Sequence, residues 1–140
     1  MNWDVGIIAG VPAWIQILIE KIIAYHGASN IHDIWPNLQV FCHGGVSFEP
    51  YKKGFERLFG KPITYIETYL ASEGFLAYQS RQETKGMQLA LNNNIFFEFV
   101  PFDEINFDLE GNMVENPEAF MLHEIEENKE YSILISTNGG

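Results

Sequence analysis

Short apolar runs alternate with stretches of helical periodicity along the first seventy residues of the chain. Strands are predicted by three apolar runs, at Val5–Ala9, Leu38–Cys42 and Ile63–Tyr69. Between the first two, Pro12–Tyr25 has apolar residues three and four positions apart, which predicts a helix that ends at Gly27. The apolar stripe of this helix leaves little polar face, so we expect the helix to be largely buried.

A second helix is predicted between the second and third strands. Ser47 can cap it, Pro50 suits its first turn and Gly60 suits its C-terminal cap. Its apolar stripe comprises Tyr51, Phe55, Leu58 and Phe59. Strands and helices therefore alternate with short connections, an order that is typical of a parallel sheet with right-handed crossovers.

The pattern changes after Gly74, where short strand candidates are separated by polar loops. The candidates are Phe75–Gln79, Met87–Leu91, Ile95–Val100 and Tyr131–Ser136. Asn92–Asn94 and Glu110–Asn112 predict tight turns, whereas Asn116–Glu127 fits either a short helix or an extended connection. The predicted fold class is therefore α/β, with a β-α-β-α-β parallel portion followed by mostly antiparallel short strands.

Length and charge narrow the possible functions. A chain of 140 residues with 46% hydrophobic residues fits one globular domain. Its formal net charge of -11, with no basic stripe, argues against nucleic acid as a partner. The most apolar segment, Val11–Ala24, contains charged residues and is shorter than the roughly 20 residues needed to span a bilayer. With Cys42 as the only cysteine and no signal peptide, we expect a cytoplasmic protein.

The ends of the second and third predicted strands carry the candidate binding residues, because ligands of parallel α/β sheets bind where strands end. Gly44 and Gly45 would let the backbone approach a ligand closely, although a plain strand-to-helix turn needs the same residues. Tyr69, Ser72 and Glu73 place a ring, a hydroxyl and a carboxylate within five residues. These groups can stack on a base, reach a phosphate and bind magnesium.

Other combinations of these residues remain open. Tyr69, Ser72 and Glu73 also fit a core tyrosine, a turn serine and a surface glutamate. Glu67 and Glu73 would suit glycoside hydrolysis if their carboxyl groups faced each other about 5 to 10 Å apart. The four histidines lack the spacing of a helical metal site. They are His26, His32, His43 and His123. Cys42, in an apolar strand, fits an inert core thiol.

Three segments, in their order along the chain, resemble a known enzyme family. They are His43-Gly44-Gly45-Val46-Ser47-Phe48-Glu49-Pro50-Tyr51, Tyr69-Leu70-Ala71-Ser72-Glu73-Gly74 and Phe97-Glu98-Phe99-Val100-Pro101. A Gly-Gly turn, a helix, a strand and then Tyr-x-x-Ser-Glu are similar to the adenylate-forming superfamily. In particular, the segments look like a bacterial-type member of the auxin-responsive promoter family of acyl acid amido synthetases. The resemblance covers nearly the whole chain, although other superfamily members often have glycine at Leu70 and threonine at Ser72.

The resemblance implies an ATP- and magnesium-dependent ligase. Members of the family activate a carboxylic acid with ATP, release pyrophosphate and pass the acyl group from its adenylate to an amino acid amine. By resemblance, Tyr69 stacks on adenine, Ser72 contacts the α-phosphate or the acyl carboxylate, and Glu73 coordinates magnesium. Ser72 and Glu73 would thus be catalytic. The backbone that would line the adenine and acyl pocket belongs to Gly44, Gly45 and Val46.

The resemblance further implies that the chain is an excised or truncated part of a larger adenylation domain. The family's Ser/Thr/Gly-rich phosphate loop, its Gly-Asp segment and its C-terminal lid have no counterpart in the sequence. We therefore expect a fragment of the large N-terminal domain of an adenylate-forming enzyme, inactive alone. Such a piece should expose an apolar face or edge strand, and homodimerisation through that face would be an expected repair.

An alternative from a different class is a self-contained, non-catalytic domain that binds a small acid or a protein partner. It predicts a closed sheet edge and a polar surface all round. Exposure of apolar side chains therefore distinguishes the two hypotheses.

Overall fold

The computed structural model describes residues 3–84 and 86–138. The chain divides into two compact units, Met1–Ala90 and Leu91–Gly140, where the chain length led us to expect one. The boundary falls between the last strand of one sheet and the first strand of another. Each unit is described by itself below.

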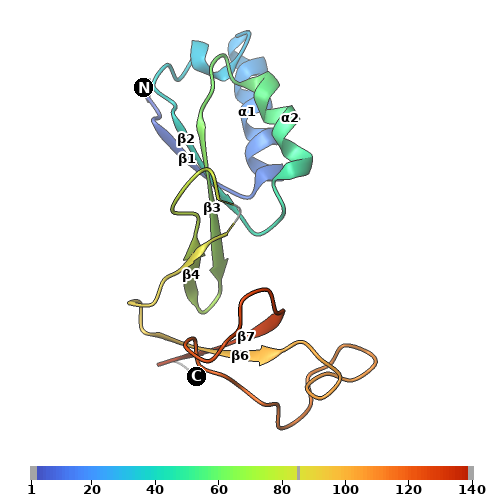
Figure 1. The fold of residues 1–140 in the computed structure, drawn as a ribbon. Coiled ribbons are helices and arrows are strands. Elements are labelled where there is room, and N and C mark those ends of the chain that lie inside the picture. Colours follow the sequence, from blue (N-terminus) through green and yellow to red (C-terminus); the bar gives the residue numbers. More distant parts are fainter. Residues whose placement is uncertain (1–2, 85, 139–140) are drawn as a thin grey trace. The chain divides into compact units, whose positions relative to one another are not determined.

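The first unit is a mixed five-stranded sheet with two helices on one side of its parallel strands (Figure 1). The strands lie in chain order and are β1 (Ile7–Gly10), β2 (Val40–Gly44), β3 (Thr64–Ala71), β4 (Gly74–Tyr78) and β5 (Gln88–Leu89). The first three are parallel, and β4 and β5 add antiparallel pairs. The α/β class and the change to antiparallel pairing are thus confirmed.

The first helix, α1 (Pro12–His26), begins and ends where its sequence predicts. Pro12 occupies its first turn, where a missing N–H costs no hydrogen bond. Gly27 ends it in the left-handed region at φ 62°, and the Gly27 N–H donates to the Ala24 carbonyl at 3.2 Å. A short 3-10 helix at Ile31–Asp33 follows before the chain enters β2.

The predicted caps of the second helix, α2 (Glu49–Leu58), are wrong. Ser47 does not cap it, because the N-cap position is Phe48, whose side chain packs into the core and gives the helix no capping hydrogen bond. Gly60 does not cap its end either, since the chain already turns extended at Phe59 to bury that ring. The Gly60 N–H instead donates to Nδ1 of His32 at 3.0 Å.

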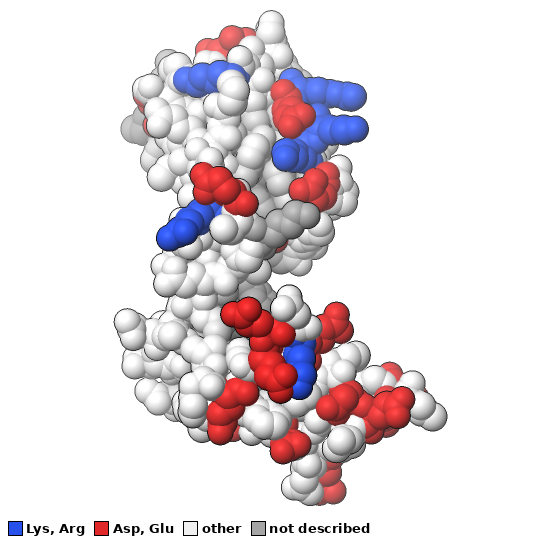
Figure 2. All heavy atoms as spheres, viewed as in Figure 1, with Lys and Arg blue, Asp and Glu red and all other residues white. Residues whose placement is uncertain are grey.

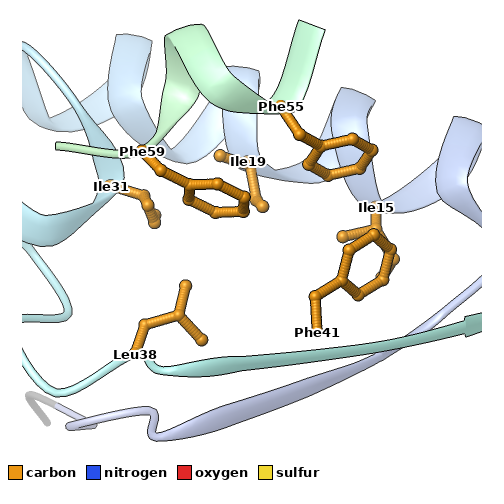
Figure 3. Close-up of a cluster of buried hydrophobic side chains, with 7 residues drawn as sticks. All are labelled: Ile15, Ile19, Ile31, Leu38, Phe41, Phe55 and Phe59. Atoms are coloured by element: carbon orange, nitrogen blue, oxygen red, sulfur yellow. The ribbon is translucent and has the colours of Figure 1, made fainter. Parts of the chain in front are cut away.

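Phe41 lies at the centre of the core between the parallel strands and the two helices. Its ring centroid is 4.8 Å from that of Phe55, which projects from α2 (Figure 3). The buried cluster comprises Ile15, Ile19, Ile31, Leu38, Phe41, Phe55 and Phe59. These residues come from both helices and from the segment that leads through the 3-10 helix into β2, so the cluster fixes the helices on one face of the sheet.

The expectation that α1 is largely buried is wrong. Only Pro12, Ile15 and Ile19 are buried in it, because a helix packed on a sheet buries one face and this apolar stripe is wider than one face. The exposed apolar side chains of α1 include Trp14, Ile17, Leu18 and Tyr25, with Trp14 72% exposed. The first unit therefore displays an apolar surface along α1.

The second unit contains an antiparallel pair of strands that are far apart in the sequence, β6 (Ile95–Pro101) and β7 (Tyr131–Thr137). They pair along their whole length. The segment between them contains the predicted turn at Gly111, with φ 83°. It is extended rather than helical around Phe120, which exchanges hydrogen bonds of 2.9 and 2.8 Å with Phe99. Residues 116–127 therefore form an extended connection and not a short helix.

Charge is unevenly distributed between the two units (Figure 2). Eleven of the 19 acidic residues follow position 97. Lys129 is the only lysine or arginine in that part of the sequence, and it pairs with Glu126 at 2.6 Å. In the first unit, Lys52, Lys53 and Arg57 gather on α2. No helix within the described ranges is long and apolar enough to cross a membrane.

Candidate functional site

The pairing of β2 with β3 brings the glycine turn that follows β2 and the segment that contains Tyr69 to the same edge of the sheet. Gly44 is the last residue of β2, and it pairs with Thr68 of β3. The next residue of β3, Tyr69, is therefore the first to extend past the end of β2. The Gly44–Val46 turn and Tyr69 thus adjoin at the carboxyl edge, where ligands of parallel sheets bind.

The backbone of the turn approaches β3 so closely that Gly44 admits no side chain. A Cβ atom at Gly44 would lie 2.2 Å from the carbonyl oxygen of Thr68. Thr68 Oγ1 also donates to the His43 carbonyl at 3.0 Å, which ties the end of β2 to β3. Gly45 follows with φ 81°, a conformation that favours glycine. Val46, next in the turn, is 44% exposed.

The segment Tyr69–Gly74 is part of a hairpin, and not the loop after a strand that its sequence predicted. Strand β3 continues to Ala71, which pairs with Gly74, so Ser72 and Glu73 form the two-residue turn into β4. The strand extends further than predicted because β4 supplies antiparallel partners beyond the end of β2. A register irregularity between Tyr69 and Leu70 interrupts this pairing.

The side chains of Tyr69, Ser72 and Glu73 are open to solvent. Tyr69 is 43% exposed, so it is not a core tyrosine. Ser72 and Glu73 are both exposed, and no hydrogen bond or ion pair holds the Glu73 carboxylate within the described part of the chain. Since Ala71 is three residues past Thr68, the hairpin turn lies roughly 10 Å along the strand from Gly44. The structure therefore places Tyr69 beside the glycine turn but Ser72 and Glu73 further out.

Geometry disfavours the pairing of Glu67 with Glu73 for hydrolysis. Glu67 is half-buried within β3, opposite His43 of β2. Ala71 lies four residue steps further along β3, which puts the backbone of the turn with Glu73 about 13 Å or more from that of Glu67. That separation exceeds the distance that two hydrolytic carboxylates require.

His43 is the residue of this edge that sequence reasoning missed. Its side chain is 4% exposed, and its ring stacks on that of Phe48 at 4.2 Å between centroids with 20° between planes. Burial lowers the pKa of His43 below its ordinary value of 6.5, while the nearby Glu67 carboxylate opposes the shift. The alternation of side chains along β2 indicates the burial of His43, because His43 lies on the same strand face as the buried Phe41.

Two hollows of the first unit lie away from this edge. One, of about 630 Å³, is lined by Val5, Ile22 and Trp35 among others, and a second, of about 410 Å³, by Phe59 and Tyr65 among others. Both adjoin the amino ends of the strands. The described residues also hold no cluster of three side chains suited to a metal ion. The candidate residues are therefore brought together by strand topology and not by a cavity.

The first prediction concerns the close approach at Gly44. Gly44→Ala should lower the free energy of unfolding by about 2 kcal/mol or more, because the added Cβ meets backbone that cannot move aside. Gly86→Ala is the matched control, since a Cβ there meets nothing within 4 Å. Urea unfolding measures both, and equal stabilities for the two variants would contradict the strand pairing at Thr68.

A second prediction concerns acid sensitivity. The folded chain disfavours protonation of His43, so the unfolded chain binds more protons as the pH falls through 6.5. The stability that neutral His43 contributes is therefore present above that pH and lost as the pH falls further. His43→Phe should therefore lose less unfolding free energy than the wild type between about pH 7 and pH 5.5. His26→Phe, at an exposed histidine, should follow the wild type. Parallel curves for all three proteins would contradict the buried environment of His43.

Two models of one known protein family match the sequence. The GH3 family N-terminal domain matches residues 10–63, and the GH3 family central domain matches residues 88–140. Gly44, Gly45 and Val46 lie within the first match, whereas Tyr69, Ser72 and Glu73 lie between the two. No match was found among curated proteins. Because two domains of one family together cover more than half of the chain, the protein belongs to the GH3 family, the auxin-responsive promoter family of acyl acid amido synthetases.

Proposed function

We propose that the chain supplies the adenine and magnesium contacts of an acyl-adenylate-forming acyl acid amido synthetase. The observation that carries the proposal is the meeting of the Gly44–Val46 turn and Tyr69 at one edge of the parallel sheet. Membership of the GH3 family supports the type of reaction. The substrates would be ATP, a carboxylic acid and an amino acid amine.

The exposed ring of Tyr69 would stack on adenine beside the glycine turn. Gly44 and Gly45 carry no side chain, so the backbone of the turn can approach the base and the acyl group closely. A ring that is 43% exposed keeps one side free for such a contact. Stacking on an aromatic side chain is worth about 1–3 kcal/mol per base, which is enough to position the nucleotide.

Ser72 and Glu73 would act on the phosphates from the hairpin turn. Attack of a carboxylate on the α-phosphate brings two anions together, so donors and a cation must offset their repulsion. The Ser72 hydroxyl can donate to the α-phosphate or the acyl carboxylate. Bound magnesium would neutralise phosphate charge.

The residues of the hairpin fit a magnesium ion shared with the nucleotide. Magnesium in such sites is usually held by one or two carboxylates, with phosphates and water as the other ligands. Glu73 supplies one exposed carboxylate, and the described residues provide no cluster of three ligands. Glu73 would therefore bind magnesium only together with the triphosphate.

The third prediction separates the roles of the ring and the carboxylate. Tyr69→Ala should weaken binding of Mg·ATP by about 1–3 kcal/mol, because the base loses its stacking partner. Glu73→Ala should instead remove the dependence of ATP affinity on magnesium. Isothermal titration calorimetry with and without magnesium measures both effects.

Two controls match these variants in residue type. Tyr25→Ala removes a tyrosine that is 87% exposed on α1, and Glu110→Ala removes an exposed glutamate of the second unit. Neither control should change the affinity for Mg·ATP. If Tyr69→Ala and Glu73→Ala behave like their controls, the segment has no part in nucleotide binding.

The fourth prediction is that the chain does not turn over by itself. Tyr69, Ser72 and Glu73 are open to solvent, and efficient adenylation needs the reacting groups to be oriented and shielded from water. A pyrophosphate-release assay with a broad panel of carboxylic acids should therefore give no turnover above the rate without protein. Robust release would show that the chain is a complete catalyst and would overturn its assignment as part of a larger site.

A further inference from the structure

A hollow of about 630 Å³ lies in the first unit at the amino ends of the parallel strands, the opposite ends from the candidate site. Its volume falls within the range of about 300 to 1,000 Å³ that is usual for sites of small organic molecules. Apolar and aromatic residues form most of its lining and are Trp3, Val5, Ile22, Ile34 and Trp35. Among the described lining residues there is one carboxylate, Asp33, and neither lysine nor arginine.

The floor of this hollow is part of the packed first unit. Val5, Ile22, Ile34 and Trp35 all pack against the buried cluster that contains Phe41. A ligand would therefore meet side chains that are already in place, which lowers the cost of ordering them on binding. The other tryptophan of the lining, Trp3, is 72% exposed, so much of its side chain is free for a contact.

Asp33 brings a fixed negative charge to the hollow. Its Oδ2 accepts the backbone N–H groups of Ser29 at 2.9 Å and Asn30 at 3.2 Å, as part of a capping box on the 3-10 helix. Its Oδ1 accepts only a long bond of 3.4 Å from the Asn30 amide. No ion pair within the described ranges neutralises this carboxylate. One oxygen of a firmly held carboxylate can therefore still act on a ligand.

The lining selects the charge of the ligand. A carboxylate without a basic neighbour repels anions, and it would also disfavour an amino acid zwitterion, whose own carboxylate would find no cation here. A metal ion lacks the cluster of three ligand side chains that it would need in the described part of the chain. An organic cation fits, because indole rings attract cations to their faces and the apolar floor accepts alkyl groups.

We propose that this hollow binds a small organic ammonium ion, whose charge is held by Trp3, Trp35 and Asp33. The inference goes beyond the proposed function, because the hollow and the Gly44–Val46 turn lie at opposite ends of the parallel strands. Binding of the ammonium ion therefore does not require a nucleotide.

The experiment uses choline as the probe, at constant ionic strength, and follows the indole N–H signals by nitrogen-15 NMR. The chain has three tryptophans, and Trp14 is the internal control, because it is 72% exposed like Trp3 but lies outside the lining. Choline should shift the signals of Trp3 and Trp35 saturably and leave that of Trp14 in place. Dimethylbutanol, in which a carbon replaces the charged nitrogen, should bind about tenfold more weakly.

Two variants test the residues that hold the charge. Trp3→Leu should lower choline affinity about fivefold, whereas Trp14→Leu should leave it unchanged. Asp33→Asn should lower the affinity for choline but not for dimethylbutanol. If loss of the capping box unfolds that variant, Trp3→Leu decides, because it changes an exposed side chain.

Several outcomes would overturn the inference. Equal affinity for choline and dimethylbutanol would mean that the hollow is merely apolar. Equal shifts of all three indole signals would mean that choline meets any exposed tryptophan. The absence of a saturable shift, or an unchanged affinity in Trp3→Leu, would remove the site.

Discussion

The packing of Phe41 between the parallel strands and the two helices is the interaction on which the first unit depends. Phe41 contacts rings from α2 and from β3, and it is completely buried. Because the aromatic cluster occupies one face of the sheet, both helices are confined to that side (Figure 3). The end of β2 then lies beside Thr68 of β3, so close that only glycine fits at position 44.

Periodicity and glycine positions predicted the elements of this fold well. The runs of apolar residues located all three parallel strands, and Pro12 with Gly27 bounded α1 almost to the residue. These signals are local, because each depends on backbone conformation within one turn or strand. The ends of α2 were wrong for the opposite reason: burial of Phe48 and Phe59 outweighed the capping preferences of Ser47 and Gly60.

The sequence singles out candidate residues for the site, but it does not predict their geometry. The sequence could not show that β4 would pair with the end of β3, which carries Ser72 and Glu73 to a hairpin turn and away from the glycines. It also could not show that His43 would be buried beside Glu67, since that neighbourhood comes from strand register. Long-range pairing therefore decides which of the polar groups can act together.

The cluster around Phe41 also has a consequence for biosynthesis. Every member of it lies before residue 60. The pairing of β6 with β7, in contrast, needs residues as far along the chain as Thr137. The amino-terminal core can thus assemble while the acidic remainder of the chain is still being translated, so the edge that carries Gly44 and Tyr69 can form before the second unit is complete.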